Sequence, residues 1–222
     1  MATLKVNEIF RSLQGEGPDA CKPATFLRLQ GCNLRCSWCD TKDSLSEGAL
    51  IYEVGSLVEE LSAYGLDFLV LTGGEPLIQS DALALLIQLL WERSKGNIRI
   101  AIQTNGTLPI PFWWLKAIWD IDRKCPSSGM SGMFNSEWCS LGRERSRLKF
   151  VVQDDEDLDY VTKALREPEL KHKKAPEIIL SPVILFEHDR LWSQKVWAYC
   201  VKNNLRMSLQ AHKIVFGNKR GV

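Results

Sequence analysis

The chain has 222 residues, enough for one domain with a buried core but too few for two domains of ordinary size. Its 28 Lys and Arg residues nearly balance 27 Asp and Glu residues, and the formal net charge of +1 argues against a nucleic-acid-binding protein. Hydrophobic residues at 45% and charged residues at 25% exclude wholesale disorder. The longest apolar stretch, residues 82–91, is shorter than the roughly 20 residues that cross a bilayer, and no signal peptide is recognisable. We expect a single cytoplasmic domain over residues 1–222, without membrane or nucleic-acid partners.

Short apolar strands alternate with helical patterns along much of the chain. Strands are expected at 25–29, 68–71, 98–102, 148–152, 178–180 and 205–209, and helices at 54–61, 80–93, 155–165 and 189–201, with Ser80 as a helix cap. Strand–helix alternation predicts parallel pairing with right-handed crossovers. About six such units are fewer than the eight of a closed barrel. The sequence therefore predicts an α/β fold, a partial (open) β/α barrel of about six parallel strands.

Polar residues follow the predicted strands at the points where the strands end. They occupy residues 30–43, 72–76, 103–107, 181–183 and 210–213. Because the carboxyl ends of parallel strands meet at one edge of the sheet, we expect these segments to share a single pocket.

Three of the seven cysteines form a C-x3-C-x2-C pattern, namely Cys32, Cys36 and Cys39. An odd number of cysteines in a chain without an export signal argues against a disulfide framework. Grouped thiolates select zinc or an iron–sulfur cluster, and three ligands on a four-iron cluster would leave one iron open. The alternative is a zinc knuckle completed by one further ligand from His172, His188, His212 or Cys125. Zinc sites usually come as two separated pairs, and there is no second C-x2-C pattern.

The cysteine pattern after one strand and Gly73-Gly74-Glu75-Pro76 after the next together resemble the radical S-adenosylmethionine superfamily. The resemblance implies that Cys32, Cys36 and Cys39 hold a 4Fe-4S cluster and that its open iron binds the methionine part of S-adenosylmethionine. Reductive cleavage of that cofactor would yield a 5′-deoxyadenosyl radical. Gly74 and Glu75 are then expected to contribute to cofactor binding.

Further segments resemble one family within this superfamily, the 7-carboxy-7-deazaguanine synthases. They are residues 9–17, 26–33, 39–41, 124–130 and 210–213, and the resemblance covers about residues 5–216. It implies a ring contraction of 6-carboxy-5,6,7,8-tetrahydropterin to 7-carboxy-7-deazaguanine with loss of ammonia, in queuosine and 7-deazapurine biosynthesis. It also implies a requirement for Mg²⁺ with Thr41 as ligand, which suits a hard cation.

The resemblance assigns two further sets of residues. Substrate binding is expected from Leu13, Gln14, Gly15, Glu16, Arg28, Thr72, Gln210 and His212. S-adenosylmethionine binding is expected from Gly74, Glu75, Asp122, Arg123, Lys124, Ser181, Pro182 and Val183. The implied partners are a reductant protein such as flavodoxin or ferredoxin and a second copy of the chain. We interpret the tryptophans of residues 113–119 as core or subunit-contact residues.

The chain departs from the family pattern at two places. Gln103 stands where the family often has Glu, and Asp122-Arg123 stand where it often has Ser-Pro, which puts the cofactor contacts of residues 122–124 in doubt. Three other functions stay open at this point: an activase that makes a glycyl radical on a protein partner, a non-catalytic zinc-binding module, and a diverged enzyme acting on another pterin-like acid. The activases would lack the motifs at residues 14–17 and 210–213.

Overall fold

The computed structural model describes residues 2–45, 48–65, 67–184, 190–217, 219 and 221. These residues form one nine-stranded sheet in the order β3-β1-β2-β4-β5-β6-β7-β8-β9. The strands are β1 (Thr3–Leu13), β2 (Pro23–Leu29), β3 (Leu50–Glu53), β4 (Phe68–Gly73), β5 (Arg99–Thr104), β6 (Ile118–Asp122), β7 (Ser146–Val152), β8 (Glu177–Pro182) and β9 (Arg206–Met207). Neighbouring strands from β2 through β4 to β9 pair in parallel, whereas β1 pairs antiparallel with both β2 and β3.

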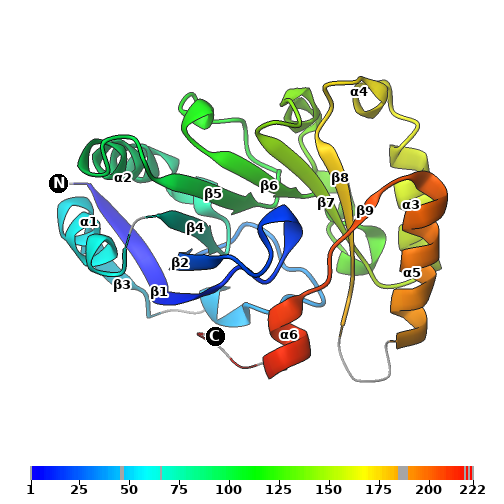
Figure 1. The fold of residues 1–222 in the computed structure, drawn as a ribbon, viewed down its shortest axis with the longest axis horizontal. Coiled ribbons are helices and arrows are strands. Elements are labelled where there is room, and N and C mark those ends of the chain that lie inside the picture. Colours follow the sequence, from blue (N-terminus) through cyan, green and yellow to red (C-terminus); the bar gives the residue numbers. More distant parts are fainter. Residues whose placement is uncertain are drawn as a thin grey trace.

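Most helices lie outside this curved sheet, whereas the last one, Ala211–Phe216, lies at its open side (Figure 1). They are α1 (Val54–Ala63), α2 (Ser80–Arg93), α3 (Asp155–Ala164), α4 (Pro168–Lys171), α5 (Arg190–Asn203) and α6 (Ala211–Phe216). The predicted open, mostly parallel α/β architecture is confirmed. Ser80 is the first residue of α2 rather than its cap, since Gln79 occupies the N-cap position and makes no side-chain cap bond. Residue 189 of the last predicted helix lies outside the described residues.

The strand–helix alternation fails in the middle of the sheet. Only short 3-10 turns, such as Trp114–Lys116, connect β5 to β6 and β6 to β7. Three tryptophans pack there instead, with ring centroids 5.5 Å apart for Trp113 and Trp119 and 5.0 Å apart for Trp119 and Trp138. Trp113 and Trp119 are buried in the core. Their interpretation as core residues is confirmed, whereas Trp114 is only partly buried against the core.

Three strands were not anticipated from the sequence. In β1, apolar and polar residues do not alternate regularly enough to mark a strand, and β3 is short and largely exposed. In β6 the sequence Ile-Trp-Asp-Ile-Asp alternates, and its two aspartates face the inside of the partial barrel rather than solvent.

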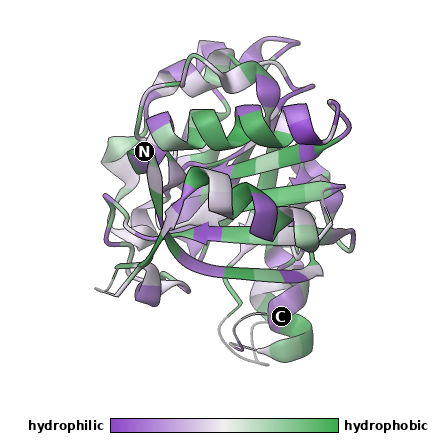
Figure 2. Ribbon diagram, turned by 90° about the vertical axis from the view of Figure 1, so that its left-hand side faces the viewer, coloured by the Kyte–Doolittle hydropathy of each residue, from purple (hydrophilic) through white to green (hydrophobic). Residues whose placement is uncertain are grey.

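The two faces of the sheet differ in chemistry. Successive strand residues point to opposite faces, so Leu27, Leu69 and Leu71 join the large core beneath the helices. The inner face carries a second, smaller cluster of buried hydrophobic residues that includes Phe26 and Val70. Figure 2 shows hydrophobic residues concentrated along the strands and on the helix faces that lie against them. Within the described part of the chain, no helix combines the length and apolar character needed to cross a membrane.

Candidate active site

Polar side chains cross the inner face of the parallel strands in two adjacent rows. Arg28 on β2 lies opposite Thr72 on β4, and Gln103 on β5 lies opposite Asp120 on β6. Asp122 on β6 in turn lies opposite Lys149 on β7. These residues line one pocket. The strand pairing therefore brings together side chains that are far apart in the sequence.

The loop after β1 closes the open side of the partial barrel. The Gly17 N–H donates to Ser208 Oγ at 2.8 Å, and the Ala211 N–H donates to the Gly15 carbonyl oxygen at 2.9 Å. A Cβ added to Gly15 would overlap the imidazole of His212. The absence of a side chain at Gly15 therefore lets the first loop pack directly against the segment that follows β9.

Glu16 lies in this closing loop, and two side chains from other elements hold its carboxylate. Lys149 Nζ donates to Glu16 Oε2 at 2.6 Å, and Gln210 Nε2 donates to Oε1 at 2.9 Å. Burial by itself raises the pKa of Glu16, but the Lys149 charge and these hydrogen bonds lower it to about 2. Burial also lowers the pKa of the neighbouring His212. At neutral pH the pocket therefore presents an ionised carboxylate beside a neutral imidazole.

The three motif cysteines line the same pocket, and each is half-buried. Burial raises the pKa of the Cys32 and Cys36 thiols, and the nearby Lys124 charge opposes this effect. Among the described residues, no three His, Cys, Asp or Glu side chains converge closely enough to share one metal ion. A four-iron cluster instead takes each thiolate on a different iron. Because all three thiols line one pocket, the cysteines of this loop fit a 4Fe-4S cluster.

The Gly73–Pro76 turn packs against the cysteine loop. A Cβ on Gly74 would overlap the Gly31 carbonyl oxygen, and the Glu75 N–H donates to that oxygen at 2.8 Å. The Glu75 carboxylate is fully buried and accepts hydrogen bonds from Leu77 N at 3.0 Å, Thr104 Oγ1 at 2.8 Å and Asn105 N at 2.7 Å. Gly74 lines the pocket and Glu75 does not. Glu75 thus holds the β4 and β5 turns together behind the site.

Comparison with known proteins agrees with this geometry. Residues 27–119 match the family model "Radical SAM superfamily". The chain is 37% identical to the 7-carboxy-7-deazaguanine synthase of Methanospirillum hungatei, over 96% of this chain and 85% of that protein. It is 34% identical to the synthase of Thermoplasma acidophilum, over 98% of this chain and 99% of that protein. The chain belongs to the 7-carboxy-7-deazaguanine synthase family. The crystal structure of QueE from Escherichia coli superposes with a TM-score of 0.75 at 24% identity, covering 95% of each chain, and supports the same fold.

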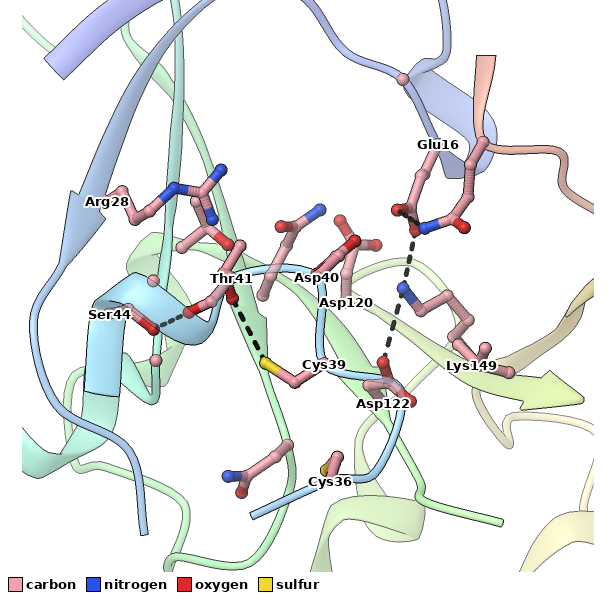
Figure 3. A pocket seen from close by; sticks show the side chains of 18 of the residues that line it. Glu16, Arg28, Cys36, Cys39, Asp40, Thr41, Ser44, Asp120, Asp122 and Lys149 are labelled. Atoms are coloured by element: carbon pink, nitrogen blue, oxygen red, sulfur yellow. Dashed lines mark hydrogen bonds and ion pairs between the residues drawn. The ribbon is translucent and has the colours of Figure 1, made fainter. Parts of the chain in front are cut away.

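Most of the residues assigned by resemblance to this family meet in the pocket. Those that line it are Leu13, Gln14, Gly15, Glu16, Arg28, Cys32, Cys36, Cys39, Thr41, Thr72, Gly74, Asp122, Lys124, Val183, Gln210 and His212. Thr41 Oγ1 lies 3.7 Å from Cys39 Sγ, and Arg28 Nε donates to Glu8 Oε1 at 2.6 Å. Figure 3 shows Arg28 and Thr41 on one side of the pocket and Glu16 with Lys149 on the other.

Four assigned residues do not line the pocket: Glu75, Arg123, Ser181 and Pro182. Arg123 points away from it, because its guanidinium forms a bidentate pair with Glu167 at 2.6 Å and lies 4.9 Å from the Phe134 ring centroid. Asp122, by contrast, pairs with Lys124 at 2.9 Å and with Lys149 at 3.5 Å. At the place where the family often has Ser-Pro, only the aspartate therefore faces the site.

Two charged strand residues of the pocket, Asp120 on β6 and Lys149 on β7, were missed in the sequence. Lys149 sits within an otherwise apolar strand, and Asp120 within a strand that was not anticipated. The sequence feature that could have identified them is a charged residue within an apolar strand, since such a residue faces either solvent or a functional cavity.

Proposed function

We propose that this chain converts 6-carboxy-5,6,7,8-tetrahydropterin into 7-carboxy-7-deazaguanine and ammonia, as a radical S-adenosylmethionine lyase of queuosine and 7-deazapurine biosynthesis. The observation that carries the proposal is one pocket that combines three cluster-type thiols with an ionised Glu16 at one side and Arg28 at the other. A bicyclic substrate with an amino-pyrimidinone end and a carboxylate end has complementary groups for both.

The assignment of substrate groups follows from hydrogen-bond chemistry. The Glu16 carboxylate accepts hydrogen bonds from the amino group and the ring N–H of the pyrimidinone. The Arg28 guanidinium keeps donors for the substrate carboxylate, since Glu8 takes its Nε. Gln14, Thr72 and Gln210 supply further polar contacts, and Leu13, Gly15 and His212 shape the wall around the ring system.

The cluster and S-adenosylmethionine, when bound, supply the radical that removes a hydrogen from the substrate. Cys32, Cys36 and Cys39 would hold the cluster. Gly74, Asp122, Lys124 and Val183 would contact S-adenosylmethionine from the pocket wall. Thr41 would contribute its hydroxyl to Mg²⁺ beside the substrate carboxylate, and the ion would steady that negative charge.

The proposal includes two protein partners. A one-electron carrier such as flavodoxin or ferredoxin would reduce the cluster in the cytoplasm, and a second copy of the chain would form a homodimer. Neither partner enters the pocket chemistry described above, so the reaction can be tested with a chemical reductant.

The deciding experiment is anaerobic incubation of the reconstituted protein with dithionite, S-adenosylmethionine, Mg²⁺ and carboxytetrahydropterin. We expect 7-carboxy-7-deazaguanine and ammonia in equal amounts. Cys36→Ala should abolish turnover and the broad iron–sulfur absorbance, because the cluster loses one of three thiolates. Cys21→Ala should keep both, since Cys21 is exposed and does not line the pocket. Full activity of Cys36→Ala, or a colourless zinc-containing wild-type protein, would contradict the proposal.

A further inference from the structure

Asp120 is a titratable residue of the pocket to which neither the motifs nor the resemblance assign a role. It lies on β6, opposite Gln103 on β5 and Arg147 on β7. Arg28 is three strands away on β2, and Lys149, which holds Glu16, is on the adjacent strand β7. In Figure 3, Asp120 lies between Arg28 and Glu16. A ligand held at its two ends by Arg28 and Glu16 would pass with its middle over Asp120.

Asp120 is also loosely held compared with its neighbours. Arg147 Nη1 lies 3.4 Å from Asp120 Oδ1, and the same guanidinium lies 3.4 Å from Asp19 Oδ2. Asp19 has a second cation, Arg99, at 2.7 Å. These contacts of Asp120 are longer than those of a strong charge-assisted hydrogen bond. The Asp120 carboxyl is therefore free to engage a ligand.

The surroundings of Asp120 make its proton available near neutral pH. Burial raises the pKa of Asp120 to about 6, against the lowering effect of Arg147 and Lys149 on β7, while Asp19 and Glu16 on the first loop raise it. Gln103, its neighbour on β5, carries no charge. A carboxyl group with a pKa near the working pH is suited to general acid and base catalysis.

We propose that Asp120 transfers the proton that accompanies the release of ammonia from the ring-contracted substrate. As the C–N bond breaks, its electron pair stays on nitrogen, and the Asp120 carboxylic acid gives nitrogen the proton that completes ammonia. The Asp120 carboxylate then takes the proton that the adjacent ring carbon loses as the product double bond forms. The acid is regenerated, and no further reactant is consumed. This proposal rests on the proposed function.

Three other titratable groups of the pocket, Glu16, Lys149 and His212, are less suited to this step. Glu16 is held ionised by Lys149. The Lys149 ammonium lies between Glu16 and Asp122, and although burial lowers its pKa, these two carboxylates raise it. His212 packs against Gly15 at the Glu16 end, where the pyrimidinone would bind. Asp120 alone among these four faces the middle of the pocket.

The test measures the radical step and the elimination of ammonia separately, in single-turnover reactions. The substrate carries deuterium at the carbon from which the 5′-deoxyadenosyl radical takes hydrogen. Deuterium in S-adenosylmethionine reports the radical step, and free ammonia reports the elimination. We expect Asp120→Asn to keep deuterium transfer while slowing ammonia release by about 100-fold. In the wild type, ammonia release should slow as pH rises above about 6, the pKa of Asp120, and in Asp120→Asn this dependence should disappear. Asp120→Glu, which keeps a carboxyl, should restore part of the rate.

Asp159→Asn is the matched control, because Asp159 is an exposed aspartate on α3 and its variant should behave as wild type. Wild-type ammonia release and pH dependence in Asp120→Asn would overturn the proposal. So would equal loss of deuterium transfer and ammonia release in both Asp120 variants, which indicates a structural role. If the wild type itself forms no ammonia, both the proposed function and this inference are wrong. If the wild type turns over and Asp120→Asn releases ammonia at the wild-type rate, only this inference is wrong.

Discussion

Lys149 Nζ and Glu16 Oε2 lie 2.6 Å apart although 133 residues separate them in the sequence. The contact joins β7 to the loop that closes the partial barrel, and Lys149 also reaches Asp122 at 3.5 Å. One ammonium group therefore connects the proposed substrate side of the pocket with the proposed cofactor side.

Replacement of Lys149 by methionine should remove the charge while keeping much of the side-chain volume. The pKa of Glu16, now about 2, should rise because its cation is lost and burial remains. We expect kcat/KM to fall by about tenfold or more at pH 7, and to fall further towards pH 5 as Glu16 becomes protonated. Lys149→Arg should retain most activity, and Lys195→Met should match wild type, since Lys195 is an exposed surface cation. A Lys149→Met profile parallel to that of wild type would contradict a role through Glu16.

Gly15→Ala should disturb the closure of the pocket, because the new methyl group overlaps the His212 imidazole. We expect KM for the pterin to increase by about tenfold with a smaller change in kcat. Gly55→Ala is the matched control: Gly55 is exposed on α1, its added Cβ meets no atom within 4 Å, and alanine favours helix. An unchanged KM in Gly15→Ala would show that His212 can move without consequence.

Glu75→Ala should destabilise the protein, because it leaves three buried donors without their acceptor. We expect the free energy of unfolding to fall by about 2–4 kcal/mol in denaturant titrations of the apoprotein. Iron content after reconstitution should fall too, since the Glu75 carboxylate holds the backbone of Asn105, whose side chain donates to Asn33 Oδ1 in the cysteine loop at 2.9 Å. Glu59→Ala, which removes an exposed ion pair with Arg93, should cost less than about 1 kcal/mol. Equal effects of the two variants would refute a bracing role of Glu75.

Thr41→Ala should weaken the response of activity to Mg²⁺ while leaving cluster absorbance intact. The hydroxyl is the proposed ligand, and Thr41 Oγ1 lies near Cys39 Sγ without being needed to hold it. Thr41→Ser keeps a hydroxyl and should keep the metal dependence. A magnesium titration of Thr41→Ala that coincides with wild type would exclude this ligand.

Asp120 should also make the free energy of unfolding depend on pH. Its folded pKa of about 6 exceeds the value of 3.8 for an unperturbed Asp, so the folded protein binds the proton more tightly than the unfolded chain. The ionised Asp120 therefore costs stability above about pH 6, and this cost disappears as pH falls below about 4. We expect Asp120→Asn to raise the free energy of unfolding at pH 8 more than at pH 4. Equal changes at both pH values would show that Asp120 titrates normally.

The sequence by itself determined the chemistry that resides in short segments. Cys32, Cys36 and Cys39 fall within eight consecutive residues, so their shared role is readable without a fold. The Gly73–Pro76 turn and the strand–helix alternation likewise depend on neighbouring residues, and they predicted the open parallel sheet and the edge on which the cysteine loop lies.

Only the tertiary structure decided which distant side chains share the pocket. Alternation along β6 turns Asp120 and Asp122 inward, and Arg123, one residue later, lies against Glu167 behind the site. Pairing of β6 with β7 brings Lys149 beside Asp122, and closure of the first loop brings Glu16 to Lys149. Strand direction and register set these contacts, and both depend on pairing across long stretches of chain, which no local pattern of residues records.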